Sequence, residues 1–221
     1  LTSYAEAERL ADTGLATAIP LYVRCKVRQQ PIVGTSLEYF DFRDARFAEG
    51  RAMAMLGECV LGAKAAENLG AGVGGTVISS PESVFDIAGV YPLKMSVVGL
   101  LEPPYTADEV AVFVDLKTAW IVQGLVHGHQ DMAAPESAPG VLSREGDNIV
   151  ANASVLQYTE ITPENIDSFH FHGDPATFPV DAVIVVPKDR KSGILLRGRY
   201  ENADAAVQML VPRQGVNELV N

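Results

Sequence analysis

The stretch that follows residue 93 restricts the fold of this chain more than any other part of the sequence. Two apolar runs of strand length, 94–101 and 111–114, are separated by two consecutive prolines. Proline cannot donate to a β-ladder, so the pair marks a loop between two strands. Asp115 then precedes a Leu-Lys-Thr-Ala sequence and is placed to cap a helix. The stretch predicts strand, loop, strand and helix, and therefore a fold that mixes both kinds of element.

Similar signals place elements along the rest of the chain. Ser3 with Glu6 forms a capping-box pattern, which predicts that the first helix begins there. The glycines at 70–75 follow a helix and open a strand, which is the order of a helix C-cap and turn and not of a phosphate-binding loop. The single tryptophan, Trp120, is expected to anchor the core. Helices are expected at 4–13, 56–69, 116–124, 162–164, 189–199 and from 214, and strands at 18–28, 32–40, 76–79, 94–101, 111–114, 148–159, 168–172, 181–186 and 208–211.

The charge of the chain excludes one class of partner. The net charge is −11 over 221 residues, whereas a nucleic-acid-binding surface needs clustered Lys and Arg. Residues 127–180 hold eight acidic residues and one basic residue, Arg144. The region 131–147, rich in Pro, Ala, Gly, Ser and Glu, is expected to be a linker. No apolar run approaches the roughly 20 residues that cross a bilayer.

The two cysteines, Cys25 and Cys59, are too few for a disulfide framework. Cys25 alternates with charged neighbours in a predicted strand, and Cys59 lies in the predicted helix 56–69. We interpret both as buried small hydrophobic residues. A disulfide between them is the alternative.

All four histidines fall in two motifs of the form H-x-H-x-D. In an extended chain, residues two apart lie on one side, so each motif can present two imidazoles near a carboxylate. Imidazole suits zinc and other late divalent metals. The candidate metal ligands are His127, His129, His170 and His172, with Asp131 and Asp174 as weaker candidates. The alternative is that these are surface or hydrogen-bonded histidines with no metal.

Other catalytic patterns are absent from the sequence. There is no G-x-S-x-G elbow, no cysteine with a histidine signature around it and no Walker motif. No cofactor other than a divalent metal such as zinc is predicted.

Three parts of the sequence together resemble the extracytoplasmic core domain of FtsX/MacB-like ABC-transporter permeases. The first is Val97-Val98-Gly99-Leu100, followed by the strand 111–116. The second is Phe47 with Glu49-Gly50-Arg51. The third is the glycine turn at 70–76, where this chain has Gly75 in place of the family's usual Asp. The likeness covers most of residues 1–125 and again about 181–221.

The resemblance implies an α+β fold with two subdomains. A larger, membrane-proximal, porter-like subdomain would combine residues 1–51 with 181–221. A smaller α/β subdomain, 52–125, would be inserted between these ends. Residues 126–180 would form an acidic insertion that carries both histidine motifs.

The resemblance also implies a non-catalytic role in an inner-membrane transporter. The domain would lie on the periplasmic or extracellular side, handle substrate or a partner protein, and relay motion driven by ATP hydrolysis. Its partners would be transmembrane helices of the same full-length chain, a separate ATP-binding subunit, and a periplasmic protein or lipid-like substrate. The alternatives are a metal-binding protein or metal-dependent enzyme that uses the H-x-H-x-D motifs, and a free-standing solute-binding module.

Overall fold

The structure, a computed structural model, contains two compact units. It describes residues 2–80, 92–103, 106–128, 141–145, 148–151, 159–171, 173–201 and 207–211. Unit 1 combines Leu1–Leu21 with Asp174–Asn221, and unit 2 is Tyr22–Gly173. The unit formed by both chain ends has fewer residues than the other unit, whereas the resemblance predicts that it is the larger of the two. The three-part division expected from the sequence stays a prediction.

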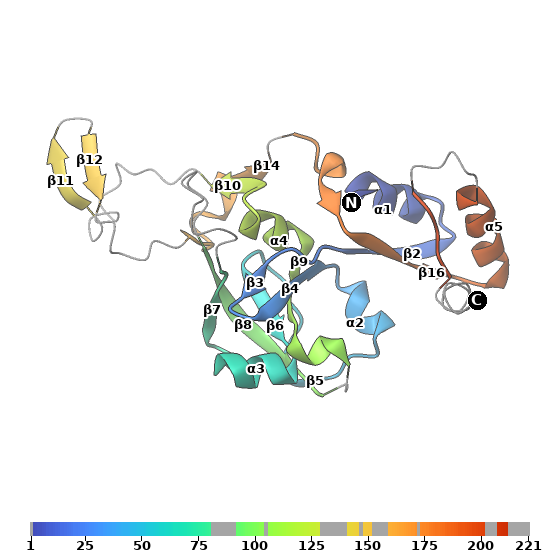
Figure 1. Cartoon of the computed structure of the whole chain (residues 1–221), viewed down its shortest axis with the longest axis horizontal. Coiled ribbons are helices and arrows are strands. Elements are labelled where there is room, and N and C mark those ends of the chain that lie inside the picture. Colours follow the sequence, from blue (N-terminus) through green and yellow to red (C-terminus); the bar gives the residue numbers. More distant parts are fainter. Residues whose placement is uncertain are drawn as a thin grey trace. The chain divides into compact units, whose positions relative to one another are not determined.

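Unit 2 holds most of the strands (Figure 1). Its helices are α2 (Glu38–Phe42), α3 (Ala63–Leu69), η1 (Ala107–Val110), α4 (Leu116–Val122) and η3 (Ile166–Ser168). Its strands are β3 (Lys26–Val27), β4 (Gln30–Thr35), β5 (Phe47–Gly50), β6 (Glu58–Leu61), β7 (Thr76–Ile78), β8 (Leu93–Leu101), β9 (Val112–Asp115), β10 (Val126–Gly128), β11 (Val141–Glu145), β12 (Asn148–Ala151), β13 (Thr159–Glu160) and β14 (Phe169–Phe171).

An eight-stranded sheet organises unit 2, and β8 pairs with four of its strands. β6 and β13 run parallel to β8, whereas β5 and β7 run antiparallel to it. Ser96 of β8 pairs with Glu58 of β6 and with Thr76 of β7, so those two strands lie on opposite edges of β8. The path continues from β6 to β9, β4 and β3. Nearly every hydrogen-bonding position along β8 is therefore used.

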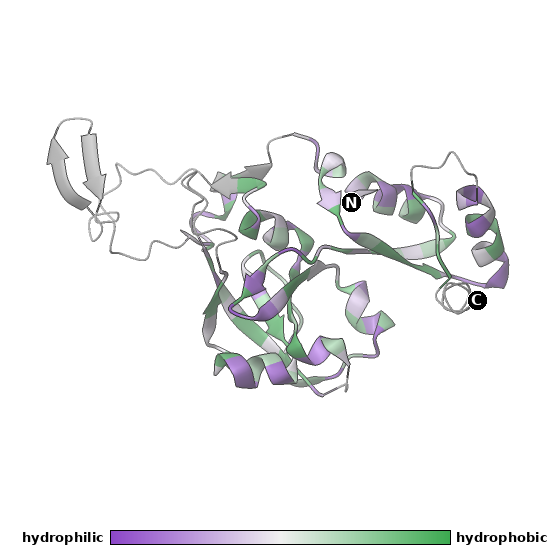
Figure 2. Cartoon of the chain, viewed as in Figure 1, coloured by the Kyte–Doolittle hydropathy of each residue, from purple (hydrophilic) through white to green (hydrophobic). Residues whose placement is uncertain are grey.

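The core of unit 2 lies on the central strands. Figure 2 shows hydrophobic residues along these strands. The residues of β6 and β9 that are 0% exposed are Cys59, Val60, Leu61, Val112, Phe113 and Val114. Trp120 of α4 is 1% exposed, which confirms it as a core residue. The Phe113 ring lies 5.5 Å from that of Tyr39 and 5.6 Å from that of Phe40, so α2 packs on the sheet through aromatic contacts.

In its described residues, unit 1 contains a two-stranded ribbon, a second and shorter two-stranded sheet, two α-helices and one short 3₁₀ helix. Its elements are β1 (Thr2–Ser3), α1 (Tyr4–Asp12), β2 (Ala16–Leu21), η4 (Pro175–Thr177), β15 (Pro179–Val180), β16 (Ala182–Pro187) and α5 (Arg190–Tyr200). β16 pairs antiparallel with β2 from Ala182↔Leu21 to Pro187↔Ala16. Leu10 of α1 and Leu196 of α5 meet in one buried cluster with Ala16, so both helices pack on the ribbon. A two-stranded ribbon alone is marginal in water, and these helices supply its hydrophobic cover.

The helix expected at 56–69 is wrong in its first half. Glu58–Leu61 is strand β6, and the helix α3 begins only at Ala63. Both faces of β6 are covered, so it reads as a continuous apolar run without alternation. Such a run cannot be told from a buried helix by periodicity. Cys59 is therefore a strand residue.

Several other boundaries differ from the expected ones. The strand expected at 18–28 ends at Leu21, and the one expected at 32–40 gives way to α2 at Glu38. Residues 208–211 form no strand, and the short helix expected to open at 162–164 begins later, as η3 at Ile166, after a turn at 163–165. Ser3 makes no side-chain cap, so the capping box is wrong although α1 begins at the expected residue. The strand and helix after residue 93 are confirmed, with Asp115 accepting from the Lys117 amide at 2.9 Å.

Gly50 and Gly99, the glycines of two of the motifs noted above, are direct partners in the β5–β8 ladder. A Cβ on Gly50 would lie 2.1 Å from the Val98 carbonyl oxygen, and one on Gly99 would lie 2.2 Å from that of Arg51. Gly50 also has a φ of +75°, which other residues rarely adopt. The two glycines allow the strand backbones to approach where a register shift interrupts the ladder.

We expect Gly99→Ala to destabilise the protein by about 1–3 kcal/mol, because the added methyl group meets backbone and not a flexible side chain. Gly72→Ala is the matched control, since a Cβ there meets nothing within 4 Å and its φ is ordinary. Urea denaturation of both variants measures the effect. Equal midpoints for the two variants would contradict the close approach of β5 and β8.

Candidate functional site

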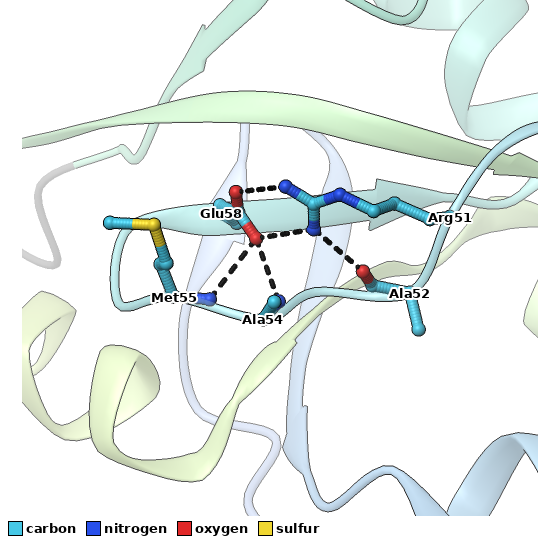
Figure 3. A network of polar contacts seen from close by, with 5 residues as sticks. All are labelled: Arg51, Ala52, Ala54, Met55 and Glu58. Carbon is cyan, nitrogen blue, oxygen red and sulfur yellow. Dashed lines mark hydrogen bonds and ion pairs between the residues drawn. The ribbon is translucent and has the colours of Figure 1, made fainter.

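The loop between β5 and β6 is closed by one carboxylate (Figure 3). Arg51, the first residue after β5, donates from Nη1 to Glu58 Oε2 at 2.8 Å and from Nη2 to Oε1 at 2.6 Å. Glu58 Oε2 also accepts from the backbone amides of Ala54 at 2.7 Å and Met55 at 3.1 Å. Arg51 Nη1 donates in addition to the Ala52 carbonyl at 2.9 Å. We call Arg51 and Glu58, with the loop they close, the clasp.

The electrostatics of the clasp favour an ionised carboxylate. Glu58 is 9% exposed and lies at the start of a fully buried strand. Its hydrogen bonds from Arg51, with those from the Ala54 and Met55 amides, lower its pKa to about 2 in spite of partial burial. Hydrogen bonds to an ionised group are stronger than neutral ones, and a forked guanidinium fixes the geometry of both partners. The clasp can therefore hold a turn rigidly, but its lone pairs are already committed.

Sequence reasoning found one half of the clasp and missed the other. Arg51 belongs to the sequence motif with Gly50, whereas the sequence predicts a helix at Glu58. The signal that could have found it is an acidic residue between Gly57 and an apolar run, since a buried strand does not begin with a charge unless that charge is paired.

A second polar cluster joins α2 to η1 in the same unit. Asp108 accepts from the Tyr39 hydroxyl at 2.9 Å and from Arg43 Nε at 2.7 Å. Arg43 Nη2 also donates to Thr106 Oγ1 at 3.2 Å. Burial, with the bond to Asp108, raises the pKa of Tyr39 to about 12, so the phenol stays protonated. This cluster fixes a loop, and its tyrosine stays protonated at neutral pH and cannot serve as a general base.

A third cluster lies inside unit 1. Glu6, 5% exposed on α1, accepts from Arg9 Nη1 at 2.7 Å and from the Tyr200 hydroxyl at the end of α5. The contact ties the two helices that cover the β2–β16 ribbon. Like the clasp, it uses a buried carboxylate, but here the carboxylate joins segments far apart in the chain.

The structure brings one residue of each histidine motif together. β10 and β14 pair antiparallel, with His127 directly opposite His170. His129, His172 and Asp131 lie outside the described residues. Asp174 caps η4, where its Oδ1 accepts from the Ala176 amide at 2.9 Å. Among the residues that the structure describes, no group of three or more His, Cys, Asp or Glu side chains is gathered as a metal site.

The disulfide alternative is wrong, because Cys25 and Cys59 are both free and buried. Cys25 Sγ lies 3.2 Å from Gln123 Oε1 in a hydrogen bond. Burial raises the pKa of the Cys59 thiol to about 12. Both thiols therefore occupy core positions, as expected for small hydrophobic residues.

No helix in the described ranges is long and apolar enough to cross a membrane.

We expect Glu58→Gln to lower stability at neutral pH by about 1–3 kcal/mol, because charged hydrogen bonds to a buried group are lost. Since folding lowers the pKa of Glu58 from its ordinary value of 4.5 to about 2, the stability from its ionised form is complete above about 4.5 and is lost as pH falls towards about 2. The difference between wild type and variant should shrink over that interval in urea titrations.

Glu67→Gln is the control for this prediction, since Glu67 pairs with Lys64 on the exposed surface, with a side chain 68% exposed. Such pairs contribute about 0–1 kcal/mol. A Glu58 effect that does not change with pH would contradict an ionised clasp.

Comparison with known proteins places these features in a family. No curated protein matches the chain. Among solved structures, the periplasmic region of MacB from Actinobacillus actinomycetemcomitans is similar at 15% identity and a TM-score of 0.42, covering 54% of this chain and 57% of that one. The extracellular domain of the noncanonic ABC-type transporter YknZ from Gram-positive bacteria is similar at 14% identity and a TM-score of 0.42, covering 55% of this chain and 66% of that one. A domain of a putative permease protein from Porphyromonas gingivalis is similar at 17% identity and a TM-score of 0.36, covering 52% and 53%.

The chain thus spans less than two thirds of the length of these structures. A family described as the MacB-like periplasmic core domain matches residues 2–160. The match includes the clasp, the paired glycines, β8 and α4, and it ends at β13. The chain belongs to the MacB-like periplasmic core domain family.

Proposed function

We propose that this chain is the non-catalytic, extracytoplasmic domain of an inner-membrane ABC-transporter permease. It handles substrate or a partner protein on the periplasmic or extracellular side and relays motion driven by ATP hydrolysis on a separate subunit. The observation that carries the proposal is the family match over residues 2–160, which spans all of the eight-stranded sheet. Transmembrane helices of the same full-length chain would connect the domain to the bilayer.

The construction of unit 2 supports a mechanical role. A body that relays motion must deform little, and unit 2 is a sheet whose central strands are fully buried. Its turns are fixed by charge-assisted hydrogen bonds, at the clasp and at Asp108. Interiors packed in this way transmit strain and do not absorb it.

The use of its polar groups supports a role without turnover. A general acid or base needs a free lone pair or proton directed at substrate, with a pKa near the working pH. The pKa of Glu58 is lowered to about 2, away from the working pH. Its oxygens accept hydrogen bonds from Arg51 and from two backbone amides. The pKa of Tyr39 is raised to about 12, and its hydroxyl donates a hydrogen bond to Asp108. These groups stabilise the fold.

The location can be tested with cysteine labelling, because both native thiols are buried, Cys25 at 5% and Cys59 at 0% exposed. We expect a membrane-impermeant maleimide to label Glu8→Cys on α1 and Asn68→Cys on α3 in intact cells that produce the complete gene product. Both positions are exposed, one in each unit. Wild type is the control, and each variant should gain a label relative to it.

Labelling of both variants only after the cells are opened would contradict an extracytoplasmic location.

A second measurement tests the proposed partner. The complete gene product, purified in detergent, should be isolated with an ATP-binding subunit whose Walker lysine is required for ATP hydrolysis. Hydrolysis that persists without this lysine would contradict the division of labour.

A further inference from the structure

We propose that the outward face of α5 in unit 1 is a surface that binds an anionic lipid bilayer. Basic side chains of this face would lie among the lipid headgroups, and two apolar side chains would enter the layer beneath them. The inference rests on the proposed function only for the nearness of a bilayer. Its evidence is the sequence and exposure of this one helix, all of whose residues the structure describes.

Apolar residues lie on both sides of α5. Ser192 and Leu196 are 6% and 0% exposed, and Leu196 packs in the cluster of Leu10, so this side faces the interior of unit 1. Ile194 lies two positions from each of them, which at 3.6 residues per turn is the opposite side of the helix. Ile194 is 64% exposed and the adjacent Leu195 is 47% exposed. A surface helix ordinarily keeps its outward face polar, and α5 does not.

The basic residues of α5 surround this apolar pair. Residues three or four positions apart are neighbours on a helix surface. Every basic residue of α5 stands at that spacing from Ile194 or from Leu195, and all of them are exposed. They are Arg190, Lys191, Arg197 and Arg199. The outward face of α5 is therefore an apolar centre with a cationic border.

The charge of this face is complementary to anionic lipid. α5 contains no acidic residue, in a chain whose net charge is −11. The two acidic residues at its ends are already engaged. Asp189 Oδ1 accepts from the Ser192 amide at 2.7 Å, and Glu201 Oε1 accepts from Arg197 Nε at 2.6 Å. Because the rest of the chain is acidic, it would oppose contact through other surfaces, and attraction is concentrated on this helix.

The apolar centre favours a bilayer over a partner that is only acidic. Helices that lie in a membrane interface bury apolar side chains below the headgroups while Lys and Arg stay among them. An acidic polypeptide needs the cations and has no use for Ile194 and Leu195. α5 has 11 residues, fewer than the roughly 20 that cross a bilayer, and Leu196 anchors its other side. The helix would therefore lie on the membrane surface.

The test is co-sedimentation of the whole chain with vesicles of equimolar phosphatidylglycerol and phosphatidylcholine, compared with vesicles of phosphatidylcholine alone. We expect binding to the anionic vesicles only, and weaker binding as the salt concentration rises. Equal binding to both kinds of vesicle, or binding to neither, would overturn the proposal.

A first double variant tests the cations. Each Lys or Arg near an anionic surface contributes roughly a fivefold factor, so Arg190→Gln with Lys191→Gln should weaken vesicle binding by about 30-fold. Arg46→Gln with Lys64→Gln is the matched control, since it removes two exposed charges from unit 2 and gives the same net charge. An equal loss in the two double variants would assign binding to the overall charge and overturn the proposal.

A second double variant tests the apolar centre. Ile194→Gln with Leu195→Gln should weaken binding by about tenfold or more, because apolar burial is lost. Leu37→Gln with Phe42→Gln is the control, since these residues of unit 2 are 51% and 46% exposed. Wild-type affinity in the α5 variant, or equally tight binding of soluble polyglutamate by the wild type, would overturn the proposal in favour of an acidic protein partner.

An environment-sensitive fluorophore gives a readout that leaves all six of these α5 side chains in place. A Cβ at Gly198 meets nothing within 4 Å, and this position lies four residues after Ile194. A fluorophore on Gly198→Cys should shift to shorter wavelength on anionic vesicles, whereas one on Asn68→Cys in α3 should not. Equal shifts at both positions, or none at position 198, would overturn the proposal. The labelling of intact cells described above tests location separately, so vesicle binding can fail while the extracytoplasmic location stands.

Discussion

The pairing of β8 on both edges is the constraint on which the rest of unit 2 depends. The strand pairs with four others, two parallel and two antiparallel. A strand used in this way has almost no free backbone group, and any shift of its register would move its apolar residues to the wrong face. Its residues alternate cleanly in burial from Leu93 to Leu101. The positions of β5, β6, β7 and β13 are therefore fixed together.

The clasp and the paired glycines allow the chain to pass from one edge of β8 to the other. β5 is antiparallel to β8 and β6 is parallel to it, on the opposite edge, so the chain must cross from one edge to the other between Gly50 and Glu58. Gly50 and Gly99 let the backbones come close where the crossing begins. Arg51 and Glu58 then hold the crossing loop by joining its two ends. A buried charge is costly when alone, and here its cost is offset by four hydrogen bonds.

Local signals predicted the elements that local interactions stabilise. α4 was predicted with its first residue because Asp115 caps it from two residues away. The glycine turn was predicted because Gly70, with a φ of +63°, needs no partner beyond its own helix. Trp120 was identified as core by its size. The α+β class, which the family resemblance implies, is what the structure shows.

What failed depends on contacts between distant segments. Nothing near Cys59 in the sequence reveals that strands border it on both edges, and so the sequence predicts a helix where β6 lies. The opposition of His127 and His170 is set by a ladder between residues more than forty positions apart. Glu58 also needed its partner to be known. For Cys59 and for the two histidines the deciding interaction is a strand register, which a single sequence does not encode locally.

The burial of Cys59 has a further consequence for how the molecule opens. Alkylating reagents attack the thiolate, and this thiol is 0% exposed, with its pKa raised to about 12 by burial. A reagent can reach it only when β6 separates from β8 and β9, which border it on either side. The rate at which Cys59 reacts in the native protein is therefore a direct measure of how often the centre of the sheet comes apart. The Cys59 thiol therefore reports opening of the sheet at the position where opening should be rarest.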